Sequence, residues 1–324
     1  VGAALVLTAF VPLLLALSWG GHAYAWTSPR IVGLLAVSAV SLILFVIAER
    51  FHAEPIMPLG LFKNRVFSAA NCAAFVISMS FMGAAIFLPL YLQLGLGMSP
   101  AASGIAMIPL MVGLIIAATL SGRLVAKTGK YKPVMLGGAA LMTVAMFLLT
   151  TLGPDATTFD VVWRVFLLGL SLGPSQGMFA LAVQNAVPME QIGVATSAAQ
   201  FFRQIGGTVG TAIFGAIMTN ALATEMARTG SAGMTLDELQ AIALRHAAAG
   251  GNGQAVAVDP QVAAAFSAAM SHVFWVGIGI AVVGLLLIAL IPQIPLRHLA
   301  PGQQRAEPLA EPGEGAAKGE FDEV

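Results

Sequence analysis

Charged residues are what this sequence lacks most. Only 9% of its 324 residues are Asp, Glu, Lys or Arg, whereas 58% are hydrophobic, and the mean hydropathy is +0.88. A soluble globular chain carries about 25% charged residues and needs a polar exterior. The composition therefore excludes a soluble enzyme and a nucleic-acid-binding protein as descriptions of the whole chain. Most of the chain is expected to lie in a lipid bilayer.

The sequence also lacks the residues of a disulfide framework or a metal centre. Its one cysteine, Cys72, lies in an apolar run, and no Cys or His residues have the spacing of zinc ligands. No phosphate-binding G-x-x-x-x-G-K-[ST] motif occurs. We therefore expect no metal, no cofactor and no enzymatic active site.

Long apolar runs, by contrast, are abundant. A helix needs about 20 apolar residues to cross a bilayer core about 30 Å thick. Eight runs approach that length, and none shows the alternation of β-barrel strands. We predict an all-α polytopic membrane protein with spans at 1–17, 31–48, 67–92, 102–120, 133–152, 161–187, 194–222 and 272–291.

Basic residues in the short loops lie mostly on one side of these spans. The opposite short loops carry only Arg30, so the positive-inside rule makes the basic side cytoplasmic, together with the tail that follows an even number of spans. Since the chain starts with Val1 inside an apolar run, we expect it to be a piece of a longer protein. The seven basic loop residues are Arg50, Lys63, Arg65, Arg123, Lys127, Lys130 and Lys132.

Two segments outside the spans have their own patterns. The outer loop at 223–271 contains Thr235-Leu-Asp-Glu238, a capping-box pattern that predicts a short amphipathic helix. That helix could lie on the membrane surface or be a solvated loop helix. The tail at 292–324 is rich in Pro, Gly and Glu and is expected to be disordered.

No acidic residue lies in the interior of a predicted span, although the chain has 15 in total. Glu49 and Asp160 lie at span edges, and no histidine is central. A proton-coupled carrier normally uses an intramembrane carboxylate or histidine. If this protein couples to protons, the responsible group is either outside this stretch or unconventional.

Two arginines do lie within predicted spans. Arg164 is close enough to the outer end of its span to reach the interface. Arg203 lies about 13 Å into its span at 1.5 Å per residue, so we expect it to face protein or a water-filled cavity. A gating or helix-tethering role and a substrate contact both remain open for it.

Uncharged polar side chains concentrate in the spans at 67–92, 161–187 and 194–222. Each alone is more often a hydrogen bond between helices than a ligand contact. Their clustering nevertheless predicts a cavity, and nearby aromatic and Met side chains could form an adaptable apolar pocket or face lipid. The candidate cavity residues are Asn71, Phe75, Phe87, Tyr91, Gln93, Gln176, Gln200 and Arg203.

Small residues recur every four positions in two spans. Gly169, Gly173 and Gly177 form one such series, and Gly206 and Gly210 form another. This spacing lets helix backbones approach closely, and it also permits bending.

The segment Gly122-Arg-Leu-Val-Ala-Lys-Thr-Gly-Lys-Tyr-Lys132 resembles the cytoplasmic G-x-L-x-D-R-x-G-R-[RK] signature of major facilitator superfamily transporters, in its second-half copy. The acidic position of that signature is Ala126 here, which places its charge-relay role in doubt. By this resemblance the candidate gating residues are Gly122, Arg123, Lys127, Gly129 and Lys130.

Three further segments resemble the fourteen-span drug:proton antiporter branch of that superfamily. They are Leu17-Ser-Trp-Gly-Gly21, Phe87-Leu-Pro-Leu-Tyr-Leu-Gln93, and the stretch from Gly193 to Gly210. The resemblance implies an extra helix pair with its linker at 1–66, a C-terminal six-helix transporter bundle at 67–291, and an N-terminal bundle that is missing here and carries the proton-coupling acids.

It also implies a function, namely alternating-access export of small amphiphilic compounds in exchange for protons across the cell membrane. The expected partners are that substrate, protons, the lipid bilayer and the missing N-terminal bundle, and no nucleic acid. A carrier for one metabolite or siderophore on the same scaffold is the alternative, because a fold does not determine a substrate.

Overall fold

The computed structural model describes residues 2–20, 24–51, 59–153, 156–229, 238 and 260–295. Within these residues the regular secondary structure is helical, apart from an isolated bridge between Gly20 and Tyr24. Seven helices in this part of the chain are long and apolar enough to cross a membrane, and Ala4–Leu17 forms a shorter apolar helix. The predicted all-α membrane fold is confirmed.

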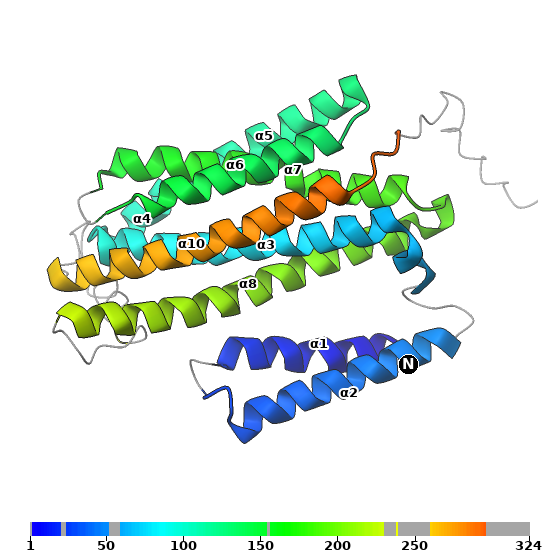
Figure 1. Cartoon of the computed structure of the whole chain (residues 1–324), viewed down its shortest axis with the longest axis horizontal. Coiled ribbons are helices and arrows are strands. Elements are labelled where there is room, and N and C mark those ends of the chain that lie inside the picture. The colour runs from blue at the N-terminus through cyan, green and yellow to red at the C-terminus, as the bar shows by residue number, and fades with distance from the viewer. Residues whose placement is uncertain are drawn as a thin grey trace, which may run out of the picture.

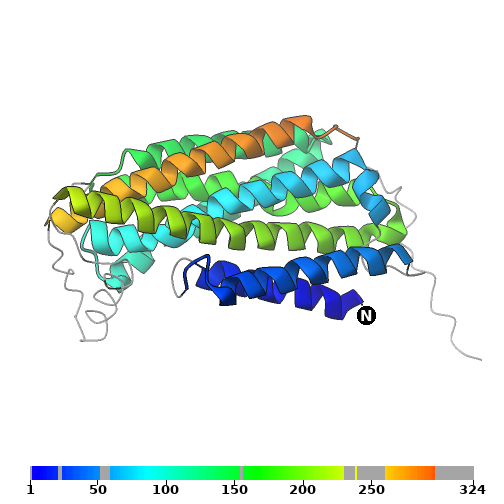
Figure 2. The ribbon, with the colours of Figure 1, turned by 60° about the horizontal axis from the view of Figure 1, so that its bottom comes forward.

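The helices form a hairpin and a bundle. The antiparallel hairpin of α1 (Gly2–Trp19) and α2 (Pro29–Phe51) lies along one side of the bundle, next to α8 (Figures 1 and 2). The long bundle helices are α3 (Arg65–Leu90), α5 (Ile108–Thr128), α6 (Lys132–Thr150), α7 (Thr158–Asn185), α8 (Ile192–Thr229) and α10 (Pro260–Leu290). The short elements are η1 (Leu59–Lys63), η2 (Tyr91–Gly95), α4 (Pro100–Ala106) and η3 (Met189–Gln191).

Glycines set the closest helix contacts in the bundle. The main pairings are α3 with α8 and α5 with α7, while α6 packs against both α7 and α10. A Cβ on Gly206 or Gly210 would collide with the backbone of α3, and one on Gly169 or Gly173 would collide with α5. Association of helices in lipid depends on such close packing, because the hydrophobic effect does not drive it. Gly177 has open space around it instead.

Local signals explain several helix ends. Thr157 and Asp160 form a capping box at the start of α7. Asn64 caps α3 and donates from Nδ2 to the carbonyl of Ala186, which follows α7, at 2.7 Å. Gly129 ends α5 in the left-handed region at φ +67°, a conformation that glycine adopts without steric cost. These helix ends are therefore defined by local signals in the sequence.

Three helices extend beyond the predicted spans. α5 continues past position 120 to Thr128, α8 continues past position 222 to Thr229, and α10 begins at Pro260 instead of at 272. A hydropathy window measures the apolar stretch that matches the bilayer, whereas a helix continues until its backbone is capped or broken. The predicted loop at 223–271 is thus helical at both ends. The short helix expected after Thr235 lies outside the described residues, apart from Glu238. The tail from 296 onward also lies outside them.

Proline and a π-turn interrupt the outer ends of two bundle helices. Met107 separates α4 from α5, whose first turn contains Pro109. α3 runs through Pro89 and passes into the π-helical turn η2. Proline removes a backbone donor, which accounts for irregular helix geometry near both positions. Pro174 lies inside α7, which remains one helix.

A candidate transport cavity between α3, α7 and α8

A hydrogen bond between charged and neutral side chains joins α8 to α7. Arg203 on α8 donates from Nη1 to Oε1 of Gln176 on α7. Arg203 is half-buried, and Gln176 is exposed on the bundle surface next to it. A charge at this depth in a membrane needs polar partners. Gln176 provides one acceptor, and the guanidinium carries four further N–H donors, since it has five in total.

Two adjoining cavities surround this pair. One has a volume of about 330 Å³ and the other about 150 Å³, and both are lined by Ser78, Met82, Arg203 and Gln204. Leu17 of α1 contributes to the larger cavity, while Gln176 and Phe179 of α7 contribute to the smaller. Cationic, amide, hydroxyl, thioether and aromatic groups thus meet at one place. That mixture resembles a ligand pocket, which is mostly apolar with a few convergent polar groups.

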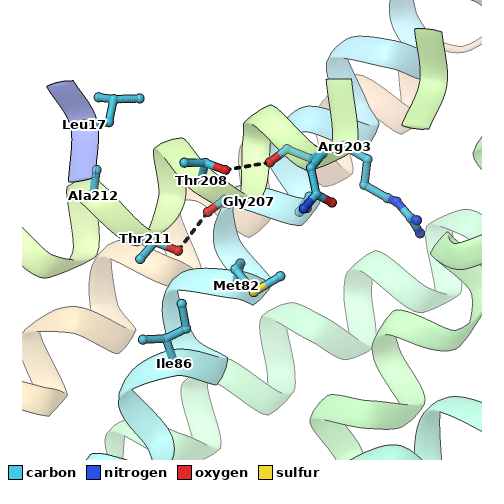
Figure 3. Close-up of a pocket in the computed structure, with 10 residues that line it drawn as sticks. Leu17, Met82, Ile86, Arg203, Gly207, Thr208, Thr211 and Ala212 are labelled. Carbon is cyan, nitrogen blue, oxygen red and sulfur yellow. Dashed lines mark hydrogen bonds between the residues drawn. The ribbon is translucent and has the colours of Figure 1, made fainter. Parts of the chain in front are cut away.

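A stripe of polar residues on α8 forms one wall of the larger cavity. Gln204, Thr208 and Thr211 lie at helical spacing on one face, and Met82 and Ile86 of α3 line the opposite wall (Figure 3). Thr208 donates to the carbonyl of Gln204 at 3.1 Å, and Thr211 to that of Gly207 at 3.0 Å. These bonds satisfy the hydroxyl donors within the helix. The hydroxyl oxygens keep lone pairs for a ligand or water.

The structure brings only some of the predicted cavity residues together. Arg203 and Gln176 meet, whereas Gln200 is exposed one turn earlier on α8 and lines neither cavity. Phe75 lines a separate apolar cavity beside α1 and α2. Asn71 is buried and donates to the carbonyl of Phe67 in its own helix at 2.9 Å.

The remaining predicted residues lie at the opposite end of α3. Phe87 and Tyr91 are buried in the bundle core, and the Tyr91 hydroxyl donates to the carbonyl of Gly153 at 2.8 Å. Gln93 donates from Nε2 to Oγ of Ser103 on α4 at 3.0 Å. These contacts hold the π-turn η2 against neighbouring elements. They do not bring these three side chains to Arg203.

Arg164 is anchored near the start of α7. Its Nη1 donates to the carbonyl of Asp160 at 2.7 Å, and its guanidinium lies 4.7 Å from the ring centroid of Trp163. A further contact of 3.6 Å joins it to Oδ1 of Asp160. These partners lie in the first turns of α7, and Nη2 of Arg164 also donates to Oγ1 of Thr151 at the end of α6, at 3.3 Å. Arg164 therefore joins the start of α7 to the end of α6, and its position at the membrane interface stays a prediction.

Among the described residues, those that line the two cavities include no acidic side chain. In the described part of the spans, Asp160 lies in the first turn of α7, and Glu225 pairs with Arg228 near the end of α8 at 3.0 Å. The described residues also contain no group of three or more His, Cys, Asp or Glu that could hold a metal ion.

The signature segment is mostly helical, and this corrects its assignment to a loop. Gly122, Arg123 and Lys127 lie on the last turns of α5, and only Gly129 and Lys130 lie in the turn before α6. All five are partly or fully exposed. The polar end of an amphipathic helix reads as a loop in a hydropathy scan, which explains the error.

That turn is tied to the end of α10. Lys132 donates from Nζ to the carbonyl of Ala289 at 2.7 Å, and the Tyr131 hydroxyl contacts the carbonyl of Pro292 at 3.3 Å. The α5–α6 turn and the end of α10 therefore lie side by side and are joined by hydrogen bonds.

Several cavity residues were not among the predicted ones. Ser78, Met82, Ser175, Thr208 and Thr211 all line the cavities. The recurrence of Gln200, Gln204, Thr208 and Thr211 along one face of α8 was a usable signal. Ser78 and Met82 have no comparable pattern, because a serine and a methionine are common in any transmembrane helix.

Comparison with known proteins connects this architecture to transport. A sequence model described as Major Facilitator Superfamily matches residues 1–211. An uncharacterised MFS-type transporter of Mycobacterium tuberculosis is 36% identical over 301 residues, which cover 92% of this chain and 43% of the relative. The multidrug transporter protein MdtP of Bacillus subtilis is 41% identical over 208 residues, covering 64% of this chain and 38% of the relative.

A tetracycline resistance determinant of Streptomyces rimosus is 34% identical over 218 residues, which cover 67% of this chain and 62% of the relative. The chain therefore spans less than half the length of the mycobacterial and Bacillus relatives.

Proposed function

The chain belongs to the Major Facilitator Superfamily of multi-pass membrane transporters, and on that premise we propose that it is the C-terminal part of a drug:proton antiporter of the fourteen-span branch. In this proposal the hairpin of α1 and α2 is the extra helix pair, and α3 to α10 form the second six-helix bundle. The whole protein exports small amphiphilic compounds from the cell in exchange for protons. The family makes it a transporter rather than an enzyme.

The observation that carries the proposal is the mixed cavity around Arg203 and Gln176. It lies between α3, α7 and α8 and combines hydrogen-bonding groups with Met82 and Phe179. A substrate that is part apolar and part polar matches both kinds of wall. Carriers of this kind bind at the midplane between two helix bundles. The exposed side of Gln176 and Gln204 is the face we assign to the missing bundle.

Proton coupling is assigned to the missing bundle. The described residues that line the cavities between α3, α7 and α8 include a cation and no carboxylate. A carboxylate in the other bundle could pair with Arg203 when deprotonated and release it when protonated. If Arg203 paired in turn with this carboxylate and with the substrate, the flux of protons would be coupled to the flux of substrate.

The membrane orientation follows from the basic segments. Lys63, Arg65, Arg123 and Lys127 are exposed at one end of the bundle helices, which we assign to the cytoplasm of the cell membrane by the positive-inside rule. The end of α10 lies at the same end, because it contacts Lys132. The C-terminus is then cytoplasmic.

The experiment is transport by the full-length protein in inverted membrane vesicles. We expect a fluorescent amphiphilic dye to accumulate inside and to leak out when an ionophore collapses the pH gradient. Vesicles lacking the protein are the control. Absence of dye transport, combined with movement of a single metabolite, would favour the metabolite or siderophore carrier instead. The full-length sequence offers a second check, because an acidic residue is expected in one of the spans that precede α1.

A further inference from the structure

A third and larger cavity separates the helix hairpin from the bundle. It has a volume of about 720 Å³ and lies between α1, α2, η1, α3 and α8. Each of these five elements contributes aromatic side chains to its wall. They are Phe10, Phe45, Phe62, Phe75, Phe201 and Phe202. In the part of the chain that the structure describes, Ser197 is the only lining residue with a polar side chain. We call this cavity the hairpin groove.

The hairpin groove extends over a limited length of α3 and α8. Its wall on α3 ends at Phe75, about 15 Å from the start of the helix, and its wall on α8 ends at Ile205, about 20 Å from the start, at 1.5 Å per residue. A bilayer core is about 30 Å thick, so one leaflet contributes about 15 Å. The groove therefore matches the depth of a single leaflet.

Basic side chains lie at the interfacial end of the groove. Lys63 directly follows the groove residue Phe62, and Arg65 begins α3; both are exposed. On the same side, Glu190 is exposed on η3, and Glu49 is buried at the end of α2. The η1–α3 turn therefore presents two cations directly beside an apolar opening. Basic groups between transmembrane helices on this side are a common binding site for acidic lipid headgroups.

We propose that the hairpin groove binds an acyl chain of an anionic phospholipid whose phosphate is held by Lys63 and Arg65. The assignment to the cytoplasmic leaflet rests on the orientation in the proposed function. The lipid fills the space between the hairpin and the bundle, where direct helix contact is sparse. It acts as part of the interface that attaches α1 and α2 to α8.

The chemistry of the walls favours a lipid chain over a transported compound. Specific small-molecule sites place a few polar groups to fix the orientation of the ligand. The hairpin groove offers the Ser197 hydroxyl alone, whereas the Arg203 cavity offers several polar groups. Its volume lies within the range of about 300–1,000 Å³ seen for ligand pockets. An acyl chain needs apolar walls and a headgroup contact, and both are present.

The test compares two glycines at which an added Cβ would have open space. A Cβ on Gly193, which lines the groove, or on Gly137 of α6, which does not, would meet no atom within 4 Å. Gly193→Phe therefore introduces a ring at the groove wall from a position where the first side-chain carbon meets no atom, and Gly137→Phe is its control. The full-length transporter is purified in detergent, titrated with dioleoylphosphatidylglycerol or dioleoylphosphatidylcholine, and examined by native mass spectrometry.

The expected result is selective loss of lipid. Gly193→Phe should bind phosphatidylglycerol about tenfold more weakly, a change of about 1.4 kcal/mol, and Gly137→Phe should bind as the wild type does. The double variant Lys63→Gln/Arg65→Gln should lose the preference for phosphatidylglycerol over phosphatidylcholine. Equal binding by Gly193→Phe and Gly137→Phe would overturn the proposal. If Gly193→Phe does not purify, Ser197→Leu narrows the same groove one turn further along.

A photo-crosslinking measurement identifies the occupant directly. Phosphatidylglycerol with a diazirine at the end of one acyl chain should label residues around Phe10 and Phe201 in the wild type. A crosslinker at Ser197 that reacts with another segment of the same protein instead of lipid would overturn the proposal. Transport is measured in parallel with these variants. Bound lipid without any transport would sink the proposed function alone, and transport without lipid in the groove would sink only this inference.

Discussion

Arg203 of α8 and Gln176 of α7 are joined by a hydrogen bond across the polar side of the bundle. α8 packs chiefly against α3, and α7 chiefly against α5. The bond therefore links two helix pairs that otherwise share limited contact. Because its acceptor is a neutral amide, the guanidinium keeps its charge and most of its donors. In the proposed function, Arg203 binds either the substrate or a carboxylate of the missing bundle, and its bond to Gln176 connects that event to both helix pairs.

The first prediction compares the two arginines within spans. Arg203→Ala in the full-length protein should lower the initial rate of transport about tenfold or more, which corresponds to about 1.4 kcal/mol or more. Arg164→Ala should have a smaller effect, because Arg164 bonds to Asp160 and Thr151 at one end of the bundle and lines neither cavity. Dye transport at matched expression measures both. Equal and mild effects would contradict the placement of Arg203 in the cavity.

The second prediction concerns the glycines between α3 and α8. Gly206→Ala places a Cβ against the backbone carbonyl of Phe75, whereas Gly177→Ala enters open space. Overpacking typically costs about 1–3 kcal/mol, so Gly206→Ala should lower thermal stability in detergent. Gly177→Ala should leave it unchanged or raise it slightly. A stable Gly206→Ala variant with wild-type transport would show that these helices separate easily.

The third prediction separates the two signature glycines. Gly129 has φ +67°, while Gly122 is helical with no atom near an added Cβ. Gly129→Ala should destabilise the protein by about 1–2 kcal/mol, the cost of a left-handed alanine. Gly122→Ala should not destabilise it. If Gly122→Ala lowers transport without lowering stability, Gly122 contacts another part of the protein that moves past it during the transport cycle.

Much of this fold could be predicted from hydropathy, because the bilayer imposes a length and requires backbone hydrogen bonds to be satisfied within each helix. The helix ends could not, since Gly129 and the Thr157 cap depend on local conformation that continues outside the apolar stretch. The hairpin and its attachment to α8 also could not be deduced from apolar runs alone.

The candidate cavity was predictable only in part. Arg203 was identified because a charge within a span needs a polar surrounding. Its partner Gln176 was one of several amides, and only the packing of α7 against α8 selects it. Tyr91 and Phe87 show the opposite case, because aromatic residues fill a helical core as readily as they line a pocket. Both are buried away from Arg203.

The fourth prediction tests the membrane orientation. In a Cys72→Ser background, Lys127→Cys at the end of α5 and Phe159→Cys at the start of α7 lie at opposite ends of the bundle and are both exposed. A membrane-impermeant maleimide added to intact cells should label Phe159→Cys and leave Lys127→Cys unlabelled. Inverted vesicles should give the reverse. Labelling of Lys127→Cys in intact cells would invert the orientation and move the hairpin groove to the outer leaflet.

Substrate protection of single cysteines tests the central claim most directly, that the cavity around Arg203 is where the transported compound binds. Gln204→Cys and Ser78→Cys line both cavities, and Lys127→Cys is the exposed control, each in the full-length Cys72→Ser protein. A saturating transported dye should slow maleimide labelling of the two cavity cysteines and leave that of Lys127→Cys unchanged. Unprotected labelling of both Gln204→Cys and Ser78→Cys, in a protein that still transports the dye, would contradict the account.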